Sequence, residues 1–220
     1  MIDFSFIKNI LLPPLLNGTI ATIRLSVFCI PASLIIGILI AVGKVYGNKI
    51  ISFLCTVYVI YFRGTPLMVL LLIIYLGLPD WGITLSSFKV AVIGLSLSSG
   101  AYHSEYIRGA IQSIKSGQVM AAKALGMSSI QVILYIILPQ ALRRAIPSCS
   151  NEVIYLVKST SLAMMISYVE LTGAGKTIAA VYFKYTEVYL FVGMVYLLLV
   201  SVISKVLNAL EKKLEIPGIE

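Results

Sequence analysis

The chain has 220 residues, of which 59% are hydrophobic and only 12% are charged, and its formal net charge is +8. Ordinary globular domains have roughly 45–50% apolar and about 25% charged residues. The composition therefore indicates an integral membrane protein. It argues against a nucleic-acid-binding protein, because the few basic residues lie beside apolar runs, as they do in the cytoplasmic loops of membrane proteins. One histidine and three cysteines without CxxC spacing predict neither a metal site nor a disulfide framework.

Long apolar runs predict an all-α polytopic protein with about five transmembrane helices. A helix needs about 20 mostly apolar residues to cross the hydrocarbon core of a bilayer. The spans are expected at residues 25–43, around 67–76, from 90 to beyond 102, at 138–157 and at 188–204.

The second of these spans is predicted to follow a helix break. Residues 50–78 are apolar except for Arg63, and they are too many for one straight span. We expect a tilted or interfacial helix over residues 50–62 and a break at the sequence RGTP, residues 63–66.

The basic residues orient the spans. The first and third connections and the end of the chain are rich in Lys and Arg, whereas residues 78–87 carry none. The positive-inside rule then places the N-terminus outside and the C-terminus inside. This gives an external segment at residues 1–17, a membrane domain at 18–213 with a cytoplasmic loop at about 115–130, and a cytoplasmic tail at 214–220.

The cytoplasmic loop contains a short helix with small side chains. The sequence QVMAAKALG, residues 118–126, consists of strong helix formers and ends at Gly126, a residue that often stops helices. It is too short to cross lipid. We expect it to lie along the membrane surface and dock into a groove of a partner, although its length alone also fits an ordinary connector.

This loop resembles the EAA loop of permease subunits of ATP-binding-cassette importers. Met120-Ala121-Ala122 is followed at the family spacing by Gly126 and by the Ile-x-Leu-Pro of residues 136–139, although Met120 stands where the family has Glu. Segments within residues 60–175, among them FRGTPLMVLLLIIYLGLP and LPQALRRAIPSCSNEVIYLVKSTSL, are similar to the polar-amino-acid branch of these importers.

The resemblance implies a type I importer permease fold in the bacterial inner membrane and the transport of polar or basic amino acids. It implies that the chain is not an enzyme and holds no cofactor, because ATP and Mg would bind to two partner ATPase subunits. Other expected partners are a second permease copy or a homologue and an extracytoplasmic amino-acid-binding protein. The residues expected to couple to the ATPases are Met120, Ala121, Ala122, Lys123 and Gly126.

Polar residues inside the predicted spans are the candidates for substrate binding. Ionisable groups at membrane depth are costly and usually mark pathways. Glu152 would bind an ammonium group, and a helix end at KSTS would present backbone groups to the substrate. The alternatives are a structural hydrogen bond for Glu152, an interfacial position for Lys158 and simple helix packing for the serines. The candidates are Ser98, Ser99, Glu152, Lys158, Ser159, Thr160 and Ser161.

Other interpretations are less well supported. The sequence TGAGKT, residues 172–177, is not a phosphate-binding loop, because Glu170 occupies the position of its first Gly and no strand precedes it. An ion-coupled carrier or channel commonly has two repeated halves, and no repeat is evident. A membrane enzyme would need a nucleophile with its base, and none appears. Arg143 and Arg144 are expected to anchor to lipid headgroups or the membrane interface.

Overall fold

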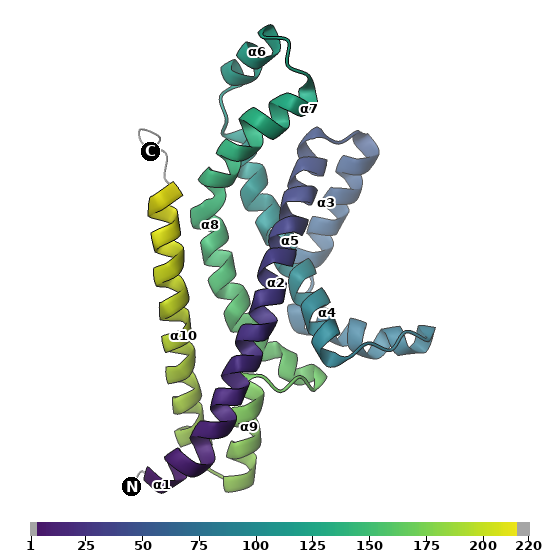
Figure 1. Ribbon diagram of the computed structural model, residues 1–220. Coiled ribbons are helices and arrows are strands. Elements are labelled where there is room, and N and C mark those ends of the chain that lie inside the picture. Colours follow the sequence, from purple (N-terminus) through teal and green to yellow (C-terminus); the bar gives the residue numbers. More distant parts are fainter. Residues whose placement is uncertain (1–3, 215–220) are drawn as a thin grey trace.

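The computed structural model describes residues 4–214, and every regular element in that range is helical (Figure 1). Four long helices dominate, namely α2 (Leu12–Tyr46), α5 (Ser87–Gln112), α8 (Leu138–Ser159) and α10 (Tyr185–Leu214). The chain begins with α1 (Phe4–Phe6) and the π-helical η1 (Ile7–Leu11), which run directly into α2. The expected external segment is therefore largely helical. Most of the expected tail lies outside the described residues.

The break predicted at residues 63–66 is confirmed. Helix α3 (Lys49–Gly64) ends there, and α4 (Leu67–Leu72) continues through η2 (Ile73–Gly77) and η3 (Leu78–Trp81). The chain bends by 105° between these two halves. Thr65 is extended, with φ −95° and ψ 132°, as expected for a residue before a proline.

The helices form an elongated bundle with two distinct ends (Figure 1). The N-terminus and α9 (Leu171–Tyr182) lie at one end, and α6 (Ser116–Ala124) lies at the other, toward which the C-terminal end of α10 also points. Three clusters of buried apolar side chains run along the bundle. One joins the start of the chain to α9 and α10, one fills the centre, and one lies beneath α6.

Helices α2 and α5 pack closely at the centre of the bundle because small residues line the contact. A Cβ atom added at Gly37 would lie 2.6 Å from the Cβ of His103, and one added at Gly100 would lie 2.7 Å from Cγ2 of Ile36. Close backbone approach of this kind is a usual source of helix association in membranes, where dispersion contacts replace the hydrophobic effect.

The length and composition of the helices indicate which of them could span a membrane. Within the described residues, three helices are long and apolar enough to cross a membrane, and the bent α3–α4 pair makes a fourth. Helix α5 has 26 residues and a length of about 39 Å at 1.5 Å per residue, which is also sufficient. Its sequence is more polar because α5 lies between α2 and α8, where its serines are buried by protein and not by lipid.

Replacing Gly37 by Ala should loosen the α2–α5 contact. The added methyl group meets the backbone of His103 and Ser104, which cannot move aside easily, and overpacking costs about 1–3 kcal/mol. The measurement is the apparent melting temperature of the purified protein in detergent. Gly109→Ala is the matched control, because a Cβ there meets nothing within 4 Å, and it should leave the melting temperature unchanged or raise it. Equal melting temperatures for the two variants would contradict this account of the contact.

Candidate functional site

A small cavity lies between α4, α5 and α8 near the middle of the bundle. Its volume is about 10 Å³, which is about the space of one water molecule. Three leucines form its apolar wall and five residues of α5 and α8 complete it. The lining residues are Leu67, Leu95, Ser98, Ser99, Glu152, Tyr155, Leu156 and Ser159. The cavity is therefore closed to anything as large as an amino acid in this conformation.

The Glu152 carboxyl is the charged group of this cavity. Its side chain is 6% exposed, and Oε1 accepts a hydrogen bond of 2.8 Å from the Ser99 hydroxyl. Among the described residues, no hydrogen bond reaches the second oxygen, Oε2. A carboxylate can accept several hydrogen bonds. Glu152 therefore keeps acceptor capacity for a group that enters the cavity.

Four of the seven predicted substrate residues converge here, and three do not. Ser98, Ser99, Glu152 and Ser159 line the cavity. Lys158 is exposed on another face of α8 and does not line it.

The predicted helix end at KSTS is confirmed, and it explains the two remaining hydroxyls. Helix α8 gives way to the 3-10 helix η5 (Thr160–Ile166). The hydroxyl of Thr160 donates to the carbonyl of Val157, and that of Ser161 donates to the carbonyl of Lys158. Both hydroxyls thus bond to the last turn of α8 in this conformation.

Two residues near the cavity were not predicted as site residues. Tyr155 lines it, and Arg63 lies at the α3–α4 break with its guanidinium 5.0 Å from the centroid of the Tyr102 ring. The Arg63 side chain is exposed and does not line the cavity. The signal in the sequence was an arginine that interrupts an apolar run just before Gly-Thr-Pro.

Helix α6 presents most of the predicted coupling residues to solvent. Met120 and Leu125 are 65% and 84% exposed, and Ala121, Lys123 and Gly126 are exposed as well. Ala122 is different, because it is buried in the apolar cluster under α6. Helix α6 therefore has an inner face that packs on its own chain and an outer face that is free for a partner.

The predicted stop at Gly126 is confirmed. Its φ of +82° is in the left-handed region, where glycine alone is unstrained. A capping box between Ser128 and Gln131 then starts α7 (Ser129–Gln131), which continues through the π-helical η4 (Val132–Ile137) into α8. Helix α6 is thus joined to α8, which carries Glu152, by one short turn.

Arg144 joins α8 to the end of α5, and the predicted anchoring of Arg143 and Arg144 at the membrane interface stays a prediction. The Arg144 guanidinium donates from Nη1 to the carbonyl and the hydroxyl of Ser113, at 2.9 and 2.8 Å. Ser113 directly follows α5, so Arg144 holds α8 against the end of α5. Gln140 of α8 also bonds to Gln118 of α6 at 2.7 Å. These bonds attach the first turn of α6, and the link that precedes it, to α8.

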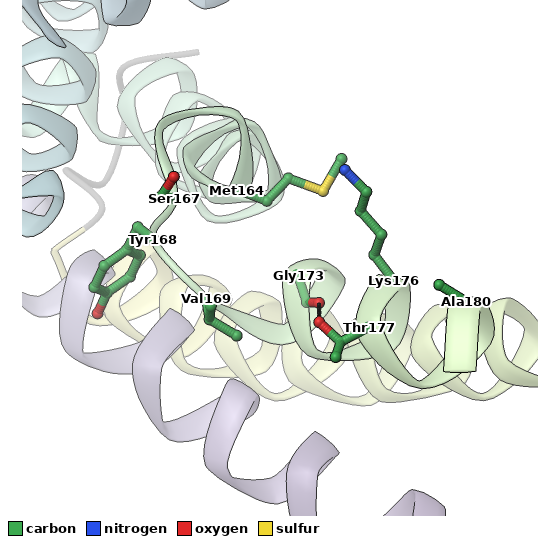
Figure 2. Close-up of a pocket in the computed structure, with 8 residues that line it drawn as sticks. All are labelled: Met164, Ser167, Tyr168, Val169, Gly173, Lys176, Thr177 and Ala180. Atoms are coloured by element: carbon green, nitrogen blue, oxygen red, sulfur yellow. Dashed lines mark hydrogen bonds between the residues drawn. The ribbon is translucent and has the colours of Figure 1, made fainter. Parts of the chain in front are cut away.

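A larger groove of about 410 Å³ lies at the opposite end of the molecule, between η5 and α9 (Figure 2). Its lining residues are Met164, Ser167, Tyr168, Val169, Gly173, Lys176, Thr177 and Ala180. Figure 2 shows Met164 and Lys176 extending toward each other across it. The groove includes residues of the TGAGKT sequence.

That sequence is helical. Glu170 caps α9 by accepting hydrogen bonds from the backbone N–H groups of Thr172 and Gly173, at 2.9 and 2.8 Å, and from the Tyr196 hydroxyl at 2.8 Å. Burial raises the pKa of the Glu170 carboxyl, and these hydrogen bonds oppose the shift. Because a carboxylate already occupies the N-terminal amides, they are not available to a phosphate in this conformation.

The comparisons with known proteins agree with these features. The model of the family described as "binding-protein-dependent transport system inner membrane component" matches residues 33–216. The chain belongs to this family. The glutamine transport system permease protein GlnP of Escherichia coli K12 is 36% identical over 207 residues, which cover 93% of this chain and 94% of GlnP. The nopaline transport system permease protein NocM of Agrobacterium fabrum C58 is also 36% identical, over 90% of this chain and 87% of NocM.

Solved structures show the same fold. A chain from the crystal structure of an amino acid ABC transporter with histidines has a TM-score of 0.86 and 33% identity, and the match covers 97% of this chain and 99% of that one. A chain of the methionine ABC transporter MetNI in an inward-facing conformation has a TM-score of 0.79 over 95% of this chain and 100% of its own, with 19% identity. The type I importer permease fold expected from the sequence is confirmed.

Proposed function

We propose that this membrane permease component serves an ATP-binding-cassette importer that moves polar or basic amino acids across the bacterial inner membrane. The observation that carries the proposal is the buried Glu152 carboxyl, which faces a cavity at membrane depth beside Ser98, Ser99 and Ser159. A carboxylate with a free acceptor oxygen is suited to the ammonium group of an amino acid. Similarity to permeases named for glutamine and nopaline transport supports the same substrate class.

The two ends of the molecule take different roles in this proposal. The end with α6 and the C-terminus faces the cytoplasm, and the end with the N-terminus and α9 faces outward, where an amino-acid-binding protein delivers substrate. Two ATPase subunits, which bind ATP and Mg, dock on the outer face of α6. A second permease, identical or homologous, completes the pathway. The charge distribution of the loops supports this orientation.

Mechanical coupling follows from the continuity of the chain. A displacement of α6 is passed through α7 and η4 to α8, because the bonds of Arg144 and Gln140 tie these parts together. Helix α8 carries Glu152 and Ser159, so its movement opens or closes the cavity. ATP binding drives this change only if the docked ATPases bind one of the two conformations more tightly.

The three predicted substrate residues outside the cavity are assigned a role in a different conformation. Lys158, Thr160 and Ser161 lie at the junction of α8 and η5 and do not face the cavity in this conformation. We propose that they meet the substrate only in a conformation in which η5 has moved. The chain itself performs no covalent chemistry in this scheme.

Glu152→Gln tests the proposed substrate contact. The substitution keeps the shape of the side chain and removes its charge, and hydrogen bonds to charged groups contribute about 1.5–3 kcal/mol. Amino-acid uptake by the complex, reconstituted in vesicles with saturating binding protein, should fall by about tenfold to a hundredfold. Glu187→Gln, at a half-buried glutamate of α10 that pairs with Lys184 at 3.4 Å and does not line the cavity, is the control and should transport normally. Wild-type uptake by Glu152→Gln would make Glu152 a structural residue.

Leu125→Asp tests the docking of α6. Leu125 is the most exposed apolar residue of the coupling loop, and a buried charge in its place would have no partner. The variant should insert into the membrane normally but lose substrate-stimulated ATP hydrolysis and co-purification with the ATPase. Ser116→Asp adds the same charge at the other end of α6 and should keep both activities. A Leu125→Asp complex that assembles and hydrolyses ATP like the wild type would rule out this docking face.

A further inference from the structure

The contact between α2 and α5 buries the only histidine of the chain. His103 is 0% exposed, and among the described residues neither Nδ1 nor Nε2 of its ring has a hydrogen-bond partner. Its neighbour Ser104 is equally buried but donates to the carbonyl of Ala101 at 2.7 Å. The imidazole is therefore a buried polar group whose hydrogen-bonding capacity no protein group uses in this conformation.

Glycines bring the backbone of α2 directly onto this part of α5. A Cβ added at Gly37 would lie 2.6 Å from the Cβ of His103 and 3.2 Å from its carbonyl carbon. Gly100, about one turn before His103, packs as closely on Ile36. Gly37 precedes Lys44, near the end of α2, by seven residues, which is about 10 Å along a helix. The ring is therefore enclosed well inside the bundle, against residues whose side chains offer it no polar group.

No acidic side chain is free to pair with the ring. Helix α5 and its main neighbours α2, α3, α4, α8, η2 and η5 contain two acidic residues, Glu105 and Glu152. Glu105 forms ion pairs with Lys44 and Arg108 at 2.8 and 2.9 Å, and Glu152 accepts from Ser99. All other charged residues of these elements are cations, namely Arg24, Lys44, Lys49, Arg63, Lys89, Arg108, Arg143, Arg144 and Lys158.

A proton changes what the ring requires of its surroundings. The neutral imidazole has one donor and one acceptor nitrogen, whereas the imidazolium has two donors and a full positive charge. Histidine is the side chain whose charge ordinarily changes between pH 5 and 8. A buried polar group without a partner costs free energy, and a buried charge without a partner costs far more. The α2–α5 contact therefore accepts the neutral ring much better than the protonated one.

We propose that His103 makes the α2–α5 contact a proton-sensitive switch. The neutral ring is compatible with the tight contact, and the protonated ring favours a conformation in which the helices separate and water reaches both nitrogens. The tight contact binds fewer protons, so it is the state that loses stability as the pH falls. Ser98 and Ser99 of the cavity lie about one turn before His103 on α5, so the same movement alters the cavity.

The competing account gives the ring a permanent partner, such as a water molecule buried beside it. A ring that is satisfied in this way stabilises the contact, and an apolar side chain in its place would leave that partner unpaired. An unsatisfied ring predicts the opposite, because an apolar side chain of similar size removes the cost of burying two polar atoms. The two accounts therefore differ in the sign of the effect of His103→Leu.

The experiment measures the apparent melting temperature of the full-length protein in detergent, from about pH 7.5 to about pH 5. Wild type is compared with His103→Leu, which removes both nitrogens, and with His103→Gln, which stays polar but does not titrate in this range. The affinity tag contains no histidine, so the ring of residue 103 is the only imidazole present. Gln112→Leu, at an exposed position of the last turn of α5, is the control for replacing a polar side chain by leucine.

At about pH 7.5, His103→Leu should melt about 2–4 °C higher than wild type, because it removes an unpaired buried group. Below about pH 6, wild type should lose about 3–5 °C more per pH unit than either His103 variant. Gln112→Leu should keep the pH dependence of wild type.

Two results would overturn the inference. If wild type and both His103 variants lose stability equally on acidification, the ring does not sense the proton. If His103→Leu melts below wild type at about pH 7.5, the ring has a permanent partner in the contact. Should His103→Leu fail to fold, that result also counts against an unpaired ring, and His103→Gln still decides the pH dependence. None of these results bears on the proposed function, because no substrate enters the measurement.

Discussion

The position of a carboxyl group inside a membrane bundle constrains the rest of this fold. A charged side chain at the centre of a span costs about 2.5–3.5 kcal/mol on insertion scales unless protein or water solvates it. Glu152 is solvated by Ser99, which requires α5 to lie against α8 with its serines turned inward. That arrangement makes α5 too polar to face lipid. The tight contact with α2, through Gly37 and Gly100, keeps it in the middle of the bundle.

In the same geometry, helix α8 connects the cavity at Glu152 to the exposed face of α6. Helix α8 contains Glu152 in its middle, and its first turns bond to α6 and to the end of α5. Helix α6 buries Ala122 against its own chain and leaves Met120 and Leu125 outside. A partner that binds the outer face of α6 therefore moves the inner face of α6 and the start of α8 with it. Recognition of the substrate and coupling to ATP hydrolysis share this one mechanical element in the proposed function.

The sequence predicted well where helices break and where they end, because local chemistry decides these positions. Pro66 forbids a continuous helix, Gly126 adopts a left-handed conformation, and the chain leaves the α-helix after Ser159. It predicted the start of the first helix poorly. Hydropathy placed the span at residues 25–43, but α2 begins at Leu12, since packing on α9 and α10 stabilises turns that are not apolar throughout.

The candidate site was predicted only in part, because its geometry depends on tertiary contacts. Ser98, Ser99, Glu152 and Ser159 converge as expected, since spacing within α5 and α8 puts them on facing surfaces. Lys158 is the next residue before Ser159 but lies about 100° around the helix, outside the cavity. Arg63 lies over Tyr102 of a different helix, and the bonds of Arg144 and Glu170 join segments whose proximity no local pattern reveals.

The most direct test of the account is a cryo-electron-microscopy structure of the permease–ATPase complex in lipid nanodiscs with a transported amino acid bound. The account predicts that the cavity between α4, α5 and α8 enlarges and holds the ligand, with its ammonium nitrogen within hydrogen-bonding distance of the Glu152 carboxylate. Density for the amino acid elsewhere in the membrane domain, with Glu152 still bonded only to Ser99, would contradict it.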